Sequence, residues 1–247
     1  SYFLFLNLKL NHLLALFYAI QISILFYPVV GTPFVDHHST FFLILAFYSF
    51  IFAINNSNYN FFFLIPFFFL LSFLSKQTPA AYGIIFISLF ILIISFFDKK
   101  NRSKILIKSI IGSIIGILLL IFFFYLTQIN LKDFYQQYIN FASSIGKTRI
   151  NNYEFSLINE IVKYKFISFF LISLCVIFTG LRIKNVLKFE DFFVIILSIC
   201  LSLILIFHQL LSLNQNFIFF LIPFLCGLIH AYYKKVFKLY YFLTVIL

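Results

Sequence analysis

Long apolar runs, separated by short polar breaks, constrain this chain more than any other feature of its sequence. Residues 80–97, for example, include no charged side chain. With 63% hydrophobic and 10% charged residues, the chain has too little polar surface for a soluble domain, in which about 25% of residues are charged. Strands of membrane barrels alternate apolar and polar residues, whereas these runs are continuous and of helical length. The sequence therefore predicts an all-α, polytopic transmembrane helix bundle.

About eight of the apolar runs are interpreted as membrane spans, because about 20 apolar residues cross the hydrocarbon core. They cover approximately residues 13–30, 40–54, 61–74, 80–97, 105–126, 166–181, 192–207 and 217–232. Residues 1–6 and the apolar residues from 240 onward are expected to belong to partial terminal helices. Because the sequence has no Met and ends inside an apolar run, we expect residues 1–247 to form a single membrane-embedded domain, truncated at both ends.

The distribution of basic residues predicts the orientation of these spans. Lysines and arginines are concentrated in short loops such as 98–104 and 182–188, which the positive-inside rule assigns to the cytoplasm. The net charge of +11 could suggest a nucleic-acid partner, but basic residues in short loops between spans fit membrane orientation better, so no such partner is expected. The alternation of spans then puts the polar segment 127–165 outside, as a long loop with one or two interfacial helices. Asp36 and Lys76 fall on the same outer side, which predicts an outward-facing site.

Asp36, His37 and His38 stand together directly before the second predicted span. Ionisable groups at a membrane are costly unless they have partners, and they often mark functional sites. Asp36 is a candidate catalytic base or ligand of a divalent metal, and His37 and His38 are candidate catalytic or metal-binding residues. Adjacent side chains point in different directions, so at most one of the two histidines is expected to share a site with Asp36. In the alternative interpretation, Asp36, Ser39 or Thr40 only caps the helix, and the two histidines lie among lipid headgroups.

Lys76 lies between two apolar spans and is followed by Gln77 and Pro79, a pattern typical of a broken or re-entrant turn. A lysine ammonium binds phosphate as a point charge, so Lys76 and Gln77 form a candidate lipid-phosphate site. His208 and Gln209 end the seventh predicted span and are further candidates. The alternative is a lysine that reaches toward the headgroups and a histidine that ends a helix.

The outer segment 127–165 adds acids, bases and aromatic rings that could bind a sugar or a phosphate. They are Asp133, Tyr135, Tyr138, Lys147, Arg149, Tyr153, Glu154 and Glu160. Arg149 is the candidate phosphate ligand among them. A solvated interfacial helix has the same composition, so that interpretation stays open.

Three short motifs carry a resemblance to a known family. Residues 33–40, Pro-Phe-Val-Asp-His-His-Ser-Thr, place an outer acid before a helix. Residues 73–79, Phe-Leu-Ser-Lys-Gln-Thr-Pro, are similar to a Leu-Thr-Lys-like element, and the polar turn 208–216 precedes an apolar helix with Pro223. With these motifs the chain resembles the GT-C superfamily of membrane glycosyltransferases. It is most similar to the family 39/83 group, which includes protein O-mannosyltransferases, aminoarabinose transferases and RgtA/B/C/D-like proteins.

The resemblance implies transfer of a sugar from a polyprenyl-phosphate donor to a hydroxyl of a glycan, lipid or protein. The reaction would take place at the periplasmic face of the bacterial inner membrane, with the lipid bilayer as a partner. Lys76 would stabilise the leaving phosphate, together with a divalent metal, Mg or Mn, held by Asp36. Two other functions stay open. One is an O-antigen-type polymerase or ligase, which would be expected to use arginines in the outer segment, where Arg149 is the only one. The other is a multi-spanning transporter or flippase.

Overall fold

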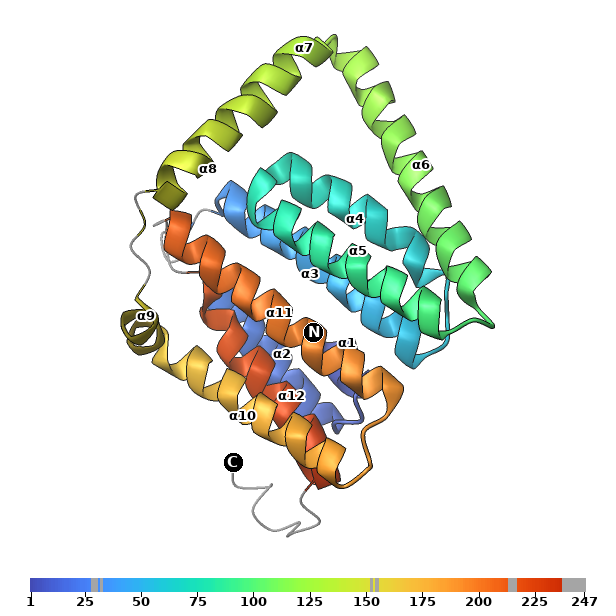
Figure 1. Ribbon diagram of the computed structural model, residues 1–247, viewed down its shortest axis with the longest axis vertical. Coiled ribbons are helices and arrows are strands. Elements are labelled where there is room, and N and C mark those ends of the chain that lie inside the picture. Colours follow the sequence, from blue (N-terminus) through green and yellow to red (C-terminus); the bar gives the residue numbers. More distant parts are fainter. Residues whose placement is uncertain (28–30, 32, 152, 154–155, 213–216, 237–247) are drawn as a thin grey trace. The chain divides into compact units, whose positions relative to one another are not determined.

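The computed structural model describes residues 1–247 except 28–30, 32, 152, 154–155, 213–216 and 237–247. The described residues form helices and their connections, without strands, which confirms the predicted all-α class (Figure 1). The expected polar turn at 213–216, Glu154 and the terminal helix from 240 onward lie outside the described residues. The elements, in chain order, are α1 (Tyr2–Asn7), α2 (His12–Phe26), α3 (Val35–Asn55), α4 (Phe61–Ser75), α5 (Gln77–Phe97), α6 (Arg102–Thr127), α7 (Leu131–Phe134), η1 (Tyr135–Asn140), α8 (Phe141–Asn151), α9 (Leu157–Lys163), α10 (Lys165–Ile183), α11 (Phe189–Ser212), η2 (Ile218–Phe220) and α12 (Leu221–Val236).

Among the described residues, five helices are long and apolar enough to cross a membrane: α3, α5, α6, α10 and α11. Three shorter apolar helices cover His12–Phe26, Phe61–Ser75 and Ile218–Tyr233. The apolar helices coincide with the predicted runs, while the expectation of about eight crossings stays a prediction.

The exposed surface of α6 is compatible with contact with lipid. Ile110, Ile114, Ile117 and Ile121 are 55%, 52%, 56% and 57% exposed. Exposed apolar side chains in such a row are rare on a water-soluble domain, and lipid solvates them at no cost. This surface supports an integral membrane location.

The chain divides into two compact units. The first comprises Ser1–Phe26, Ser156–Ile199 and Ile218–Leu247, and the second comprises Tyr27–Phe155 and Cys200–Phe217. The division falls within α11, whose C-terminal part belongs to the second unit.

In the first unit, Tyr18 of α2 joins two helices that are distant in sequence. Its hydroxyl lies 3.2 Å from Nδ1 of His230 and 3.7 Å from Sγ of Cys226, both on α12. Lys235 of α12 forms an ion pair with Asp191 of α11, with 2.8 Å between Nζ and Oδ2. These polar contacts fix α12 against α2 and α11.

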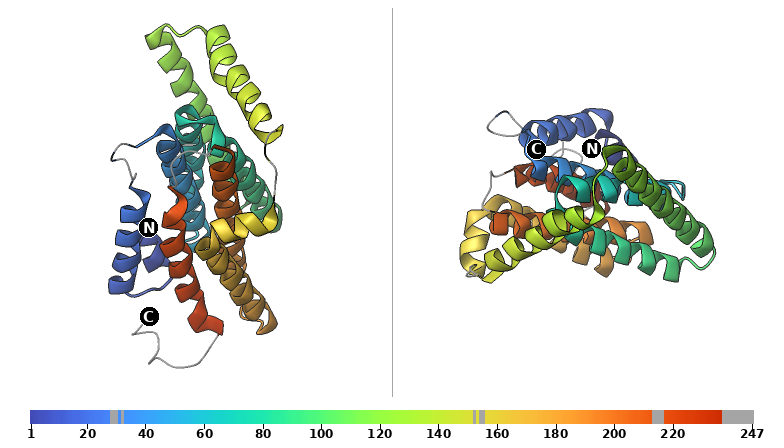
Figure 2. Two further views of the ribbon diagram at one scale, coloured as in Figure 1. Left: turned by 90° about the vertical axis from the view of Figure 1, so that its left-hand side faces the viewer. Right: turned by 90° about the horizontal axis from the view of Figure 1, so that it is seen from above.

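In the second unit, α3, α4 and α5 lie side by side, as Figure 1 and Figure 2 show, and α6 packs against α4. Phe47 and Phe50 of α3 and Phe62 of α4 are fully buried. At Gly112 of α6 the backbones of α6 and α4 lie close together, because a Cβ there would lie 2.2 Å from the carbonyl oxygen of Phe63. Small residues permit such close packing of membrane helices.

The connection between α4 and α5 is a single residue, Lys76. Its backbone is extended (φ −161°, ψ 137°), as is that of Thr78 (φ −115°, ψ 133°). Thr78 precedes Pro79, and the proline ring disfavours helical geometry in the residue before it. Proline is tolerated in the first turn of a helix, where the backbone N–H groups have no helical partner. The predicted break between two apolar helices is therefore confirmed.

The outer segment 127–165 is mostly helical. Gln128 ends α6 in a left-handed conformation (φ 55°), and the Asn130 side chain caps α7 by accepting the backbone N–H of Lys132 at 2.9 Å. Helical structure then continues from Leu131 to Asn151 through the π-helical turn η1, a form that is frequent at functional sites. The interfacial location of these helices stays a prediction.

Candidate functional site

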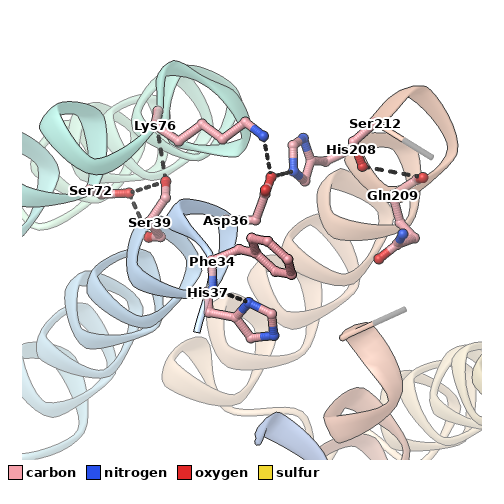
Figure 3. Close-up of polar contacts among 9 residues, drawn as sticks. All are labelled: Phe34, Asp36, His37, Ser39, Ser72, Lys76, His208, Gln209 and Ser212. Carbon is pink, nitrogen blue, oxygen red and sulfur yellow. Dashed lines mark hydrogen bonds and ion pairs between the residues drawn. The ribbon is translucent and has the colours of Figure 1, made fainter. Parts of the chain in front are cut away.

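Asp36 is the centre of a buried polar cluster, which we define as Asp36, Lys76 and His208. Its Oδ1 lies 2.6 Å from Nζ of Lys76 and 2.6 Å from Nε2 of His208 (Figure 3). The three residues come from the first turn of α3, the α4–α5 connection and the C-terminal part of α11, all in the second unit. The side chains of Asp36 and His208 are 3% and 2% exposed, and that of Lys76 is 20% exposed. Because little water screens these contacts, each is stronger than its equivalent at a wet surface.

The histidine that joins Asp36 is His208, and neither His37 nor His38 does so. Nδ1 of His37 accepts the backbone N–H of Phe34 at 3.3 Å, which is half of a capping box at the start of α3. The His37 ring points away from the Asp36 carboxylate in Figure 3 and packs against Phe217. His38 is exposed on α3. Asp36 and Lys76, both predicted for the site, lie together as a direct ion pair.

Two serines hold the backbone of Lys76 in place. Ser39 Oγ donates to the Lys76 carbonyl at 3.1 Å, and Ser72 Oγ donates to the Ser39 carbonyl at 2.7 Å. The Lys76 N–H donates to the Ser72 carbonyl at 3.0 Å. Sequence reasoning missed both serines, since a serine inside an apolar helix gives no signal of its partner. The one usable sign was the spacing of Asp36 and Ser39, which puts them on one face of α3.

A cavity of about 580 Å³ opens beside the cluster. Its size is within the range of about 300–1,000 Å³ that is usual for ligand sites. Lys76, Gln77 and His208 line one part of it, and Lys147 and Arg149 of α8 line another. Among the described residues that line it there is no Asp or Glu. The cavity is therefore suited to an anionic ligand.

Other residues predicted for the site lie outside this cavity lining. Asp36 is buried and is not among the lining residues, so it acts on the cavity through Lys76 and His208. Gln209 is also buried and is absent from the lining. Tyr135 is exposed on η1.

Tyr138 of η1 connects the outer segment to both sides of Lys76. Its hydroxyl donates to the carbonyl of Phe73, near the end of α4, and its own carbonyl accepts from Nε2 of Gln77 at 2.6 Å. Burial raises the pKa of Tyr138 to about 12, so the phenol stays protonated and donates at neutral pH. The Phe73 carbonyl has no helical partner at the end of α4, and the tyrosine satisfies it.

The described residues do not provide a site for Mg or Mn at Asp36. Mg²⁺ prefers several oxygen ligands in octahedral geometry, whereas the Asp36 Oδ1 faces an ammonium and an imidazole. Among the described residues there is no group of three or more His, Cys, Asp or Glu side chains that could hold a metal ion. Lys76 and His208 both contact Oδ1 of Asp36, where a metal ion held by this oxygen would need further oxygen ligands. No step in the proposals below uses a metal.

Comparison with known proteins leaves the family resemblance as a prediction. No family model, curated protein or solved structure matches the chain. The functional argument therefore rests on the geometry of the cluster and its cavity.

Replacing Tyr138 with phenylalanine is expected to lower the free energy of unfolding by about 1 kcal/mol, because the part-buried Phe73 carbonyl loses its donor. Tyr135→Phe, in the same turn but exposed, is the matched control and should change it by less than about 0.5 kcal/mol. Thermal unfolding of the purified protein in detergent measures both. Equal effects of the two substitutions would show that Tyr138 does not anchor the outer segment.

Proposed function

We propose that this chain is a membrane-embedded glycosyltransferase that moves a sugar from a polyprenyl-phosphate donor to an acceptor hydroxyl. The observation that carries the proposal is the Asp36–Lys76–His208 cluster beside a cavity whose described lining residues include cations and no Asp or Glu. We place the reaction at the outer, periplasmic face of a bacterial inner membrane, following the predicted orientation of the basic loops. The acceptor is a glycan, a lipid or a protein.

Lys76 stabilises the leaving group in this mechanism. An ammonium has three N–H donors, and Asp36 uses one of them, so the others are available to phosphate oxygens. As the bond between the anomeric carbon and the phosphate oxygen breaks, the electron pair passes to the phosphate. Fixed positive charge aimed at this developing negative charge lowers the barrier.

His208 is the general base in this mechanism, and Asp36 is its positioning residue. The hydrogen bond from Nε2 of His208 to Asp36 selects the tautomer that leaves Nδ1 free of a proton. Carboxylates orient catalytic histidines in this way on unrelated folds. The acceptor oxygen attacks the anomeric carbon, the new glycosidic bond forms, and the hydroxyl proton passes to Nδ1 of His208.

The test is turnover by the purified chain in liposomes that contain a radiolabelled polyprenyl-phosphate sugar and an envelope extract as the source of acceptor. The expected result is release of polyprenyl phosphate, with the label transferred to an acceptor. If the donor stays intact with the wild-type protein while a control transferase consumes it in the same liposomes, the proposal fails.

His208→Gln is expected to reduce turnover by about 100-fold. The low end of general-base contributions applies because glycosyl transfer has an oxocarbenium-like transition state. Donor binding should change little, since the Lys76–Asp36 ion pair stays in place. Turnover and donor affinity are measured separately on the same preparation. Loss of affinity with unchanged maximal turnover would assign His208 to binding instead.

A further inference from the structure

The charges around the cavity are unequally compensated. The Lys76 ammonium is paired with Asp36 at 2.6 Å, so a neighbouring carboxylate compensates part of its charge. Lys147 and Arg149 also line the cavity, and neither forms an ion pair with any described residue. Among the described residues, the α8 side of the cavity therefore carries two positive charges without an acidic partner.

A single phosphodiester does not match this arrangement. It carries one negative charge and, under the proposed function, lies at Lys76. The cations of α8 would then be left without a ligand. A diphosphate diester carries two negative charges, and the planar guanidinium of Arg149 suits two oxygens of the second phosphate.

We propose that the donor is linked to its lipid by a diphosphate. The phosphate attached to the sugar lies at Lys76, and the second phosphate lies at Lys147 and Arg149. This proposal rests on the proposed function and narrows its substrate class. The leaving group becomes a polyprenyl diphosphate, and the bond that breaks is still the one between the anomeric carbon and the phosphate oxygen.

The cavity has the polar side chains that such a head group needs besides charge. Gln77, Gln137, Ser143 and Ser212 line it together with the cations. Amides and hydroxyls can donate to the remaining phosphate oxygens or bind sugar hydroxyls. Its volume of about 580 Å³ is within the range of sites that enclose ligands of this size.

The test compares farnesyl phosphate with farnesyl diphosphate as short probes, by calorimetric titration of the full chain in lipid nanodiscs. The wild-type protein is expected to bind the diphosphate about tenfold or more tightly than the monophosphate. The double variant Lys147→Ala with Arg149→Ala should lose this preference and keep its affinity for the monophosphate. Lys132→Ala is the matched control, because Lys132 is exposed in the same outer segment and is not among the residues that line the cavity.

Equal affinity for the two probes in the wild-type protein would overturn the diphosphate proposal. If, in that case, Lys76→Ala still weakened the binding of both probes, the proposed function would stand without the diphosphate proposal. If Lys132→Ala lost the preference for the diphosphate as fully as the double variant, the preference would come from general attraction by a basic surface. This result would also overturn the diphosphate proposal. Binding of neither probe by the wild-type protein would overturn the proposed function itself.

Discussion

Lys76→Ala is expected to reduce glycosyl transfer by about 10³-fold. The substitution removes the positive charge that faces the leaving phosphate, and a single donor aimed at developing negative charge contributes about 10²–10³ in rate. The ammonium also binds the donor, so affinity falls with turnover. Transfer of a radiolabelled sugar, measured under saturating donor, separates the two effects.

The variant also leaves the Asp36 carboxylate without its ammonium partner, and this impairs folding. Removing one partner of a buried ion pair costs about 3–5 kcal/mol, and the low end applies because Lys76 is 20% exposed. The double variant Lys76→Met with Asp36→Asn removes both charges and should recover most of the stability. Transfer should stay lost in it. A stable double variant with normal transfer would show that Lys76 has no role in the reaction.

Gly112→Ala is expected to lower the free energy of unfolding by about 2 kcal/mol. The new Cβ would lie 2.2 Å from the backbone oxygen of Phe63, which cannot move away as a flexible side chain could. Overpacking of this kind costs about 1–3 kcal/mol or more, and the gain of about 1 kcal/mol in helix propensity offsets only part of it. Thermal unfolding in detergent measures the change.

Gly116→Ala is the matched control for this prediction, one turn further along α6. A Cβ at Gly116 would meet only Cδ2 of Leu70 at 3.7 Å, which is an ordinary contact. This variant should be as stable as the wild-type protein or slightly more stable. Equal stability of the Gly112 and Gly116 variants would contradict the close packing of α6 on α4.

Much of the fold could be predicted, because a run of apolar residues in lipid has few alternatives to a helix. The break at Lys76 was also predictable, since Pro79 and an isolated charge mark it locally. Gly112 gave no such signal. Its importance depends on Phe63 of another helix, and the sequence does not specify which helices pair.

The residues of the candidate site could be predicted from the sequence, but their geometry could be predicted only in part. Asp36, Lys76 and His208 were each expected on the outer side because each is a polar group at the end of an apolar run. Their direct contact depends on how three distant segments pack, and so does the local capping role of His37. Lys147 and Arg149 were candidates by composition alone. Only the cavity they line distinguishes them from the other charges of the outer segment.

Binding of a long-chain polyprenyl phosphate, followed by native mass spectrometry of the protein released from nanodiscs, tests the central claim most directly. The claim is that the Asp36–Lys76–His208 cluster holds the phosphate of a lipid-linked donor. We predict one bound lipid on the wild-type protein and on Lys132→Ala, and loss of it on the stable double variant Lys76→Met with Asp36→Asn. Equal occupancy of all three proteins would contradict the claim.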